Sequence, residues 1–165
     1  MDWDNDGLHD LLVGDTGGNV HIYLNTINNL TPALDGNIII YINEGTDAAP
    51  VFNSYYYMQL SSGADFDIGS RAAPRIIDWN NDGLKDLLVG EDHGYIYFLK
   101  NAGTNAEPLF NDLRKLELQT GEPLRYLPAE ESISRLAVAD WNNDGYSDIL
   151  VGGGDGRVML FLAEP

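Results

Sequence analysis

The sequence has no cysteine, few basic residues and no long hydrophobic run. The absence of Cys from all 165 residues excludes a disulfide framework, a zinc–thiolate site and a cysteine nucleophile. Nine Lys and Arg face 26 Asp and Glu, and the formal charge of −17 disfavours binding to nucleic acids or anionic membranes, which would repel the chain. The longest apolar run, around Ile38–Ile42, is too short for a membrane-spanning helix, which needs about 20 residues.

The residues that are abundant predict a globular β protein. Hydrophobic residues make up 44% of the chain and charged residues 21%, a balance typical of a folded domain. Eighteen Gly and nine Tyr, with many Asn and Asp, are typical of short strands joined by tight turns. Short β-branched and aromatic runs recur between these turn residues, and no stretch sustains helical periodicity.

One segment of the sequence is repeated three times. Residues 2–14, 78–90 and 140–152 share nine of thirteen positions and read DWDNDGLHDLLVG, DWNNDGLKDLLVG and DWNNDGYSDILVG. A turn and an aromatic-rich strand follow each copy. The first unit also carries an insertion, in which residues 37–43 form a further strand-like run. Each unit therefore contains roughly four strands, which is the content of a propeller blade.

The repeats predict an all-β fold, a β-propeller-like array of about three four-stranded antiparallel blades. The terminal blades are expected to be incomplete, because Met1 is followed at once by a repeated loop and Pro165 follows a third strand. Three blades are fewer than the four to eight of a closed propeller. We therefore expect residues 1–165 to be one propeller-like domain or a fragment of one, with blade units at approximately 1–70, 71–132 and 133–165.

The repeated loop has the ligand pattern of a calcium site. It reads D-x-[DN]-x-D-G-x-x-D, so that oxygen-bearing side chains stand at positions 1, 3, 5 and 9, and Gly at position 6 allows a sharp turn. A curled loop of this kind directs successive oxygens, with the backbone carbonyl of position 7, towards one centre. Oxygen ligands without His or Cys suit Ca²⁺ better than Mg²⁺, which demands stricter octahedral geometry. We predict about three Ca²⁺ ions.

The predicted ligands are the side chains at positions 1, 3, 5 and 9 and the carbonyl at position 7 of each copy: Asp2, Asp4, Asp6, Asp10 and Leu8; Asp78, Asn80, Asp82, Asp86 and Leu84; Asp140, Asn142, Asp144, Asp148 and Tyr146.

Two other interpretations of this loop are less favoured. A single D-x-N-x-D-G segment is often an Asx-rich turn without a metal. Three copies, each with an Asp at position 9, favour the metal site, because a turn needs no acid there and clustered carboxylates repel one another. The first six positions also match an EF-hand loop, but position 12 holds Val13, Val89 or Val151 instead of Glu.

Other residues carry weaker signals. Trp3, Trp79 and Trp141 occupy position 2 of the loops, where alternation turns them away from the metal, and we expect them to pack between blades. Alternation along Tyr55–Tyr57 predicts burial of one face, which favours a half-core role over a carbohydrate site. Residues 152–157, GGGDGR, are rich in Gly but precede no helix, so we expect a hairpin turn instead of a phosphate site.

The repeat units resemble FG-GAP/VCBS repeats, the calcium-binding blades of integrin α-subunit-like β-propellers. The resemblance rests on D-W-x-N-D-G-x-x-D-L-L-V-G, on the preceding strands at 73–77 and 135–139, and on the N-x-G-T-x-x-x-P-[VL]-F stretches at 43–52 and 101–110. It implies that the loop joins the first two strands of a blade and binds Ca²⁺. It also implies a role in adhesion, in ligand binding or in support of an enzyme domain.

These observations together predict a calcium-binding extracellular β-propeller module for adhesion, ligand binding or structural assembly. No catalytic residue is predicted, because the three His residues have no Ser or Cys partner pattern. The alternative is a non-catalytic or substrate-binding part of a larger extracellular enzyme such as a polysaccharide lyase. We expect the chain at the cell surface or outside the cell. Its expected partners are other copies of itself, or missing blades of a parent protein, joined through open blade edges, and a protein or carbohydrate ligand.

Overall fold

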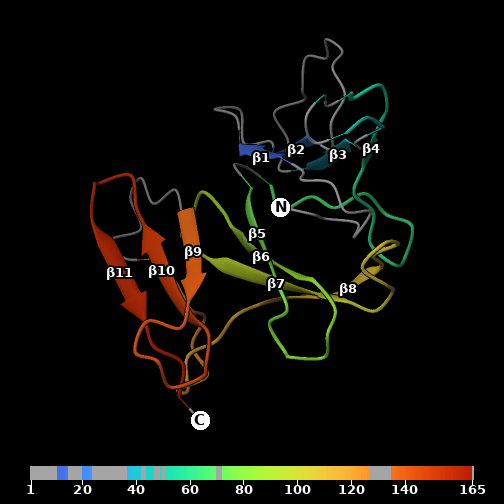
Figure 1. Ribbon diagram of the computed structural model, residues 1–165. Helices are drawn as coiled ribbons and strands as arrows, with labels where there is room; N and C mark the ends of the chain where they lie inside the picture. The colour runs from blue at the N-terminus through green and yellow to red at the C-terminus, as the bar shows by residue number, and fades with distance from the viewer. Residues whose placement is uncertain are drawn as a thin grey trace. The chain divides into compact units, whose positions relative to one another are not determined.

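The computed structural model describes residues 11–14, 20–23, 37–41, 44–46, 49, 51–69, 72–126 and 135–164. Within these ranges the chain forms eleven strands and no helix, which confirms the predicted all-β class (Figure 1). No segment of them forms a helix that could cross a membrane. The strands make three sheets, one in each repeat unit, and the closed arrangement of a propeller stays a prediction.

The second repeat forms a four-stranded sheet. Its strands are β5 (Ala73–Ile77), β6 (Asp86–Gly90), β7 (Ile96–Asn101) and β8 (Phe110–Lys115), in that spatial order. Strand β6 pairs antiparallel with both β5 and β7, and Leu88 lies opposite Arg75 and Phe98. Every residue of β6 is buried, as expected in the interior of a sheet for the apolar residues Leu87–Val89.

The third repeat forms a sheet with the same register. Its described strands are β9 (Arg135–Ala139), β10 (Asp148–Gly152) and β11 (Val158–Phe161), with β10 in the centre. Leu150 lies opposite Ala137 and Leu160, which is the place of Leu88 in the second sheet. Strand β11 is an edge strand of the described sheet, and its Val158 side chain is 66% exposed. Pairing of open edges with another chain stays a prediction.

The first repeat departs from the predicted antiparallel blade. Its strands are β1 (Leu11–Gly14), β2 (Val20–Tyr23), β3 (Ile38–Tyr41) and β4 (Tyr55–Tyr57), in that order. Strands β2 and β3 pair parallel, whereas β1–β2 and β3–β4 are antiparallel. A parallel pair needs a crossover connection of about a dozen residues, and the insertion between Tyr23 and Ile38 is long enough to supply one. The strand predicted within residues 37–43 is confirmed as β3.

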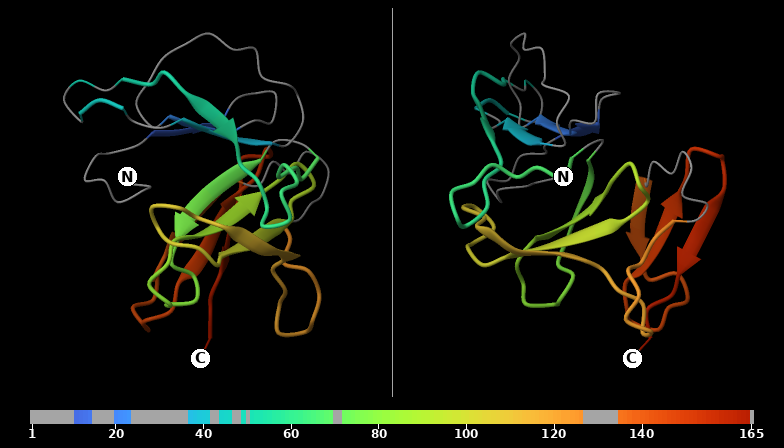
Figure 2. Two further views of the ribbon diagram at one scale, coloured as in Figure 1. Left: turned by 90° about the vertical axis from the view of Figure 1, so that its right-hand side faces the viewer. Right: turned by 180° about the vertical axis from the view of Figure 1, so that it is seen from behind.

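The chain divides into two compact units, Met1–Ala72 with Asn101–Asn111, and Ala73–Lys100 with Asp112–Pro165. In the second unit β9 lies beside β5, and the two sheets share one hydrophobic core (Figure 1 and Figure 2). The buried members of this core come from both sheets and from the segment after β8: Leu88, Ile96, Phe98, Leu124, Tyr126, Leu136, Ile149 and Val151.

The core of the first unit forms around β3, whose four residues are all buried. The buried side chains of Met58, Phe66 and Phe110 belong to the same unit. Backbone hydrogen bonds fix these segments, since the N–H of Met58 donates to the carbonyl of Ile38 at 2.8 Å and the N–H of Phe66 donates to the carbonyl of Met58 at 2.8 Å. A further bond at 2.8 Å joins the N–H of Ser61 to the carbonyl of Phe110.

The N-x-G-T stretch that begins at Asn101 folds as a closed loop around that buried side chain. Asn101 Oδ1 accepts hydrogen bonds from the N–H groups of Gly103 at 2.9 Å and Leu109 at 3.1 Å, and its Nδ2 donates to the carbonyl of Thr104 at 3.0 Å. A Cβ at Gly103 would overlap the backbone on the other side of the loop, and the same holds for Gly45 in the related stretch of the first unit. Only glycine fits these positions without a shift of the backbone.

Two expectations about aromatic residues are wrong. All three residues of Tyr55–Tyr57 are exposed, because the short strand β4 lies at the edge of its described sheet. Trp79 packs against the shared core of the second unit, as predicted, but Trp141 is 60% exposed. Within the second unit, Trp79 is one of the side chains packed against the shared core, and Trp141 is not. Trp3 lies outside the described residues.

The turn between β10 and β11 is the hairpin predicted for residues 152–157, and it supports a buried tyrosine. The N–H of Gly153 donates to the carbonyl of Arg157 at 3.0 Å. The hydroxyl of Tyr126 donates to the Asp155 carboxylate, and the Tyr126 ring lies against Gly153 so closely that a Cβ there would overlap it. The turn therefore holds Tyr126 in the core by shape and by a hydrogen bond.

Replacing Gly153 by Ala tests this packing. We expect Gly153→Ala to lower the free energy of unfolding by about 1–3 kcal/mol, the usual cost of overfilling a packed site. The measurement is urea denaturation followed by tryptophan fluorescence. Gly152→Ala is the matched control, because the nearest atom to its Cβ would be the Arg135 carbonyl oxygen at 3.8 Å. Equal stability of the two variants would contradict the role assigned to Gly153.

Candidate metal centre

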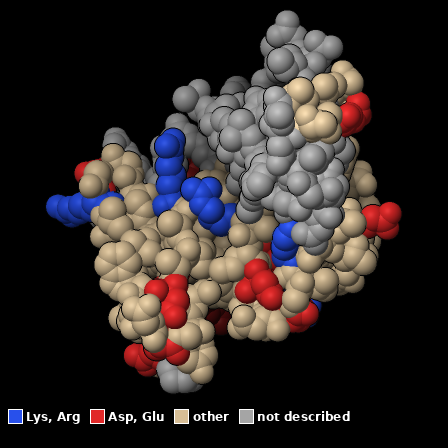
Figure 3. All heavy atoms as spheres, in the orientation of Figure 1, with Lys and Arg blue, Asp and Glu red and all other residues tan. Residues whose placement is uncertain are grey.

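The two described copies of the repeated loop occupy equivalent places. Residues 78–85 join β5 to β6, and residues 140–147 join β9 to β10, as the resemblance implied for the first two strands of a blade. The copy that contains Asp2, Asp4, Asp6, Leu8 and Asp10 lies outside the described residues. On the face drawn in Figure 3, acidic side chains gather over the end of the β9–β11 sheet where the loop between β9 and β10 lies.

In the second loop the side-chain oxygens of positions 1 and 3 converge on one backbone N–H. Asp78 Oδ1 and Asn80 Oδ1 each accept a hydrogen bond from the N–H of Asp82, both at 3.0 Å. Asp78 Oδ2 accepts from the N–H of Gly83 at 2.9 Å. The loop is therefore curled around the position 1 carboxylate by bonds from its own backbone.

The third loop repeats these bonds with nearly the same distances. Asp140 Oδ1 accepts from the N–H of Asp144 at 3.0 Å, Asn142 Oδ1 accepts from the same N–H at 3.1 Å, and Asp140 Oδ2 accepts from the N–H of Gly145 at 3.0 Å. The curled shape is thus a property of the motif itself.

The conserved shape of the two loops depends on a residue that the sequence analysis did not single out. Position 4 is Asn in all three copies, and Asn81 and Asn143 adopt left-handed φ values of 58° and 59°. Asn tolerates this conformation better than most residues, and Gly83 and Gly145 supply a second left-handed residue at φ 87° and 92°. The presence of Asn at position 4 in all three copies was the sequence signal that could have predicted this left-handed residue.

The acid at position 9 is held against the backbone. Asp86 Oδ2 accepts from the N–H of Trp79 at 3.2 Å. Asp148 Oδ2 accepts from the N–H of Trp141 at 2.7 Å, and its Oδ1 accepts from the N–H of Ala163 at 2.8 Å. Both carboxylates are fully buried, and a buried charge needs such partners. The acid at position 9 therefore holds the loop closed through hydrogen bonds from the backbone. The sequence analysis predicted this acid only as a metal ligand and did not foresee its structural role.

The acid at position 5 differs in its surroundings between the two loops. Asp82 Oδ2 lies 3.0 Å from Lys100 Nζ, and the hydrogen bond from Lys100 lowers the pKa of the Asp82 carboxyl, as does the N–H of Leu84. In the third sheet Leu162 stands in the place of Lys100, because Leu99 pairs with Leu87 in the second sheet as Phe161 pairs with Ile149 in the third. The second loop thus carries its own cationic partner, and the third has a leucine there.

The side chains at positions 1, 3 and 5 are brought together, whereas position 9 is turned to the backbone. Asn80 Nδ2 donates to Asp82 Oδ2 at 2.9 Å, and Asn142 Nδ2 donates to Asp144 Oδ2 at 2.8 Å, so the three positions form one cluster in each loop. Among the described residues no group of three or more His, Cys, Asp or Glu forms a ready metal centre. The carboxylate oxygens of Asp78 and Asp140 accept one N–H bond each and have further acceptor capacity, so the ligand chemistry fits a hard cation such as Ca²⁺.

The comparison with protein families covers both described loops. Residues 78–151 match the FG-GAP-like repeat. The resemblance to FG-GAP repeat proteins is therefore confirmed over the FG-GAP-like segment, which begins at the first acid of the second loop and ends within β10. No curated protein and no solved structure was found to match the chain.

The structural role of position 9 predicts an effect that needs no metal. We expect Asp148→Asn to lower the free energy of unfolding by about 1–3 kcal/mol in the presence of EGTA, because an amide NH₂ would face a buried backbone N–H. Asp144→Asn in the same loop is the control, and we expect less than about 0.5 kcal/mol from this exposed position. The measurement is urea denaturation. Equal and small losses of unfolding free energy in the two variants would show that the acid at position 9 has no structural role.

Proposed function

We propose that the chain is a calcium-binding extracellular module of the FG-GAP type, without catalytic chemistry of its own, that serves ligand binding, adhesion or structural assembly. The single observation that carries the proposal is the shared hydrogen-bond network of the two described loops. It clusters the oxygen-bearing side chains of positions 1, 3 and 5 in each loop. The FG-GAP-like segment contains both loops and supports the same conclusion.

Bound calcium would crosslink the residues of each loop and so stabilise the pair of strands that the loop joins. Asp78, Asn80 and Asp82 in the second loop, and the same positions in the third, would hold the ion directly. The acid of position 9 and the carbonyl of position 7 would complete the shell of six to eight oxygens that Ca²⁺ takes. Because each loop joins two adjacent strands of a sheet, ion binding would favour the folded state. Three such ions would replace the disulfides that the sequence lacks.

The proposed location and architecture rest on weaker support. Loops of this ligand type suit the millimolar calcium found outside cells. The β5–β8 and β9–β11 sheets share one core, and adjacent blades of a propeller pack in this manner. The exposed apolar residues of β11 would suit pairing with a further strand.

Removal of calcium tests the proposal directly. We expect excess EGTA to lower the melting temperature by at least about 5 °C, because each site adds about 2.7 kcal/mol at 100 times its Kd. Ca²⁺ should restore the loss better than Mg²⁺ at equal concentration. The measurement is calorimetry of the whole chain.

The control variants distinguish calcium bound at the loops from calcium bound elsewhere on the acidic surface. The double variant Asp78→Asn with Asp140→Asn should lose most of the calcium-dependent shift, whereas Glu107→Gln, an exposed acid outside the loops, should keep it. Identical melting curves in calcium and in EGTA would contradict the proposed function.

The Lys100–Asp82 pair predicts unequal affinities for calcium. The ammonium group competes with the ion at the second loop, so we expect Lys100→Leu to tighten calcium binding there by about two- to fivefold. The third loop should be unchanged. The reciprocal variant Leu162→Lys should weaken the third loop and spare the second.

The two loops are distinguished by NMR titration of calcium, in which the amide resonances of Gly83 and Gly145 report on each loop separately. If Lys100→Leu left the midpoint of the Gly83 titration where it was, the ammonium group would have no influence on the site.

A further inference from the structure

The third sheet presents an apolar face to water. Val158 and Leu160 of β11 are 66% and 39% exposed, and they share one face because alternate residues of a strand point the same way. Leu150 lies on that face between Leu160 and Ala137, which are its partners on the two flanking strands. We call the face that holds these four residues the open face.

The same face of the second sheet is covered. The register identifies the residues that stand there in the places of Leu150, Val158 and Leu160: Leu88, Ile96 and Phe98. All three are at most 2% exposed, because they lie in the core that the second sheet shares with the third. The repeat therefore builds a face that a neighbouring sheet covers in one copy and that is exposed in the next.

The tryptophan at position 2 of the loop shows the same contrast. Trp79 packs against the shared core, whereas Trp141 is 60% exposed. The backbone of both residues is held in the same way, since each N–H donates to the position 9 acid of its own loop. The open face therefore continues onto a large aromatic side chain at the loop.

The shared core shows what kind of surface covers such a face. The third sheet covers the second with the other side of its strands, and the residues of that side are Leu136, Val138, Ile149, Val151, Met159 and Phe161. The open face thus fits the opposite face of a further repeat. In the second sheet that opposite face is already buried, since Leu87 and Leu99 are fully buried.

The first sheet has the register of a covering face. Leu11 and Val13 of β1 pair with β2 in the register by which Leu87 and Val89 of β6 pair with β7. The sequence thus repeats, in β1, the apolar residues of the covering positions. A second copy of the chain therefore carries the surface that the open face fits.

We propose that the open face of the third sheet docks the first sheet of a second copy of this chain. Two different faces meet in this contact, so it is head-to-tail and builds rings or filaments. It buries side chains of the sheet face and needs neither bound calcium nor hydrogen bonds from the edge of β11. The inference rests on the structural-assembly role in the proposed function, and it names the partner and the face that binds it.

Sedimentation equilibrium of the whole chain between about 1 µM and 1 mM tests the docking. We expect the average mass to rise with concentration, with an apparent Kd of about 100 µM or lower. Raising NaCl from about 50 to 500 mM should strengthen association at least about threefold, because salt screens the repulsion between chains of charge −17.

The same runs in calcium and in EGTA, below the melting temperature in each, separate the two proposals. Association in both media without a calcium-dependent melting shift would contradict the calcium-binding function and support the docking. A calcium-dependent melting shift in a chain that stays monomeric would support the calcium sites and contradict the docking.

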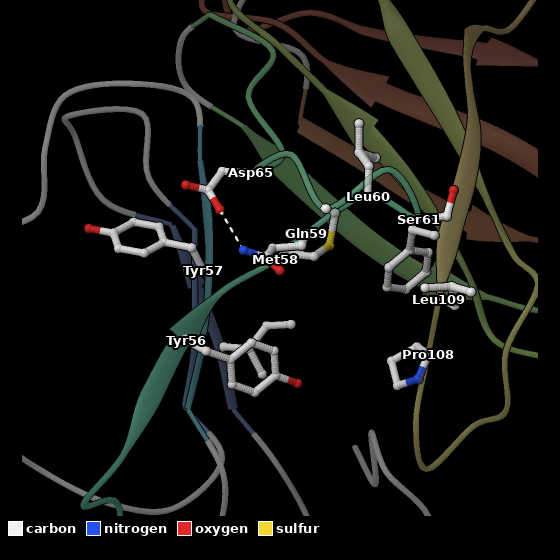
Figure 4. Close-up of a pocket in the computed structure, with 12 residues that line it drawn as sticks. Tyr56, Tyr57, Met58, Gln59, Leu60, Ser61, Asp65, Pro108 and Leu109 are labelled. Atoms are coloured by element: carbon white, nitrogen blue, oxygen red, sulfur yellow. Dashed lines mark hydrogen bonds between the residues drawn. The ribbon is translucent and has the colours of Figure 1, made fainter.

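Lysine variants locate the contact on the open face. Leu160→Lys and Val158→Lys should each weaken association at least about tenfold through the buried charge. Lys lowers the net negative charge, so this loss would not come from stronger repulsion. Leu109→Lys is the matched control and should stay within about twofold. Leu109 is 47% exposed on the loop drawn in Figure 4, and Val51, its equivalent in the first unit, is 43% exposed, so exposure at this position is a property of the repeat.

A mixing experiment tests the head-to-tail direction. A fluorescently labelled Leu160→Lys chain should not bind to itself, but its first sheet should still bind the open face of the unlabelled natural chain. Fluorescence anisotropy measures both. If two open faces met instead, the labelled variant would bind neither chain.

Three results would overturn the proposal. The first is the mass of a single chain at about 1 mM in 500 mM NaCl. The second is association that neither Leu160→Lys nor Val158→Lys weakens. The third is failure of the labelled variant to bind the natural chain. Amide spectra show whether each variant is folded, and Val158→Lys, at the more exposed position, keeps the test decisive if Leu160→Lys does not fold.

Discussion

Hydrogen bonds from backbone N–H groups to carboxylates are the interactions on which each described loop depends. The buried Asp148 accepts one such bond from the start of its loop and another from Ala163, beyond the end of β11. One side chain therefore connects the loop that follows β9 to the segment that follows β11, across the central strand of the sheet. Since these partners come from the protein's own backbone, they hold the loop against the sheet.

The same backbone template is combined with different charges in the two loops. The position 5 acid meets Lys100 in the second sheet and finds Leu162 in the equivalent place in the third. An ammonium group at 3.0 Å offsets part of the repulsion between the clustered acids. The second loop therefore needs an external cation less than the third. A repeat thus fixes the shape of a site, while a single residue outside the motif sets its electrostatics.

The sequence predicted the strands and the loops of the second and third repeats because each depends on residues close together in the chain. It could not give the direction of β3, since parallel pairing with β2 depends on a long insertion with no periodic pattern. It also could not give the exposure of Tyr55–Tyr57 or Trp141, which depends on whether a second layer covers them. The role of Asp148 was hidden for a similar reason: spacing shows which acids share a turn, and not which distant N–H, such as that of Ala163, each one meets.

The loop around Asn101 shows how a local sequence pattern sets the position of an exposed apolar residue. The buried side chain of Asn101 makes three hydrogen bonds that close the loop, and one of them is accepted from the N–H of Leu109, whose side chain is exposed. Gly103 allows this closure, because any side chain there would meet the opposite backbone. The position of Leu109 is thus set by an asparagine and a glycine at the other end of the loop. A loop closed in this way can keep an apolar side chain exposed to water, because its backbone hydrogen bonds are satisfied within the loop.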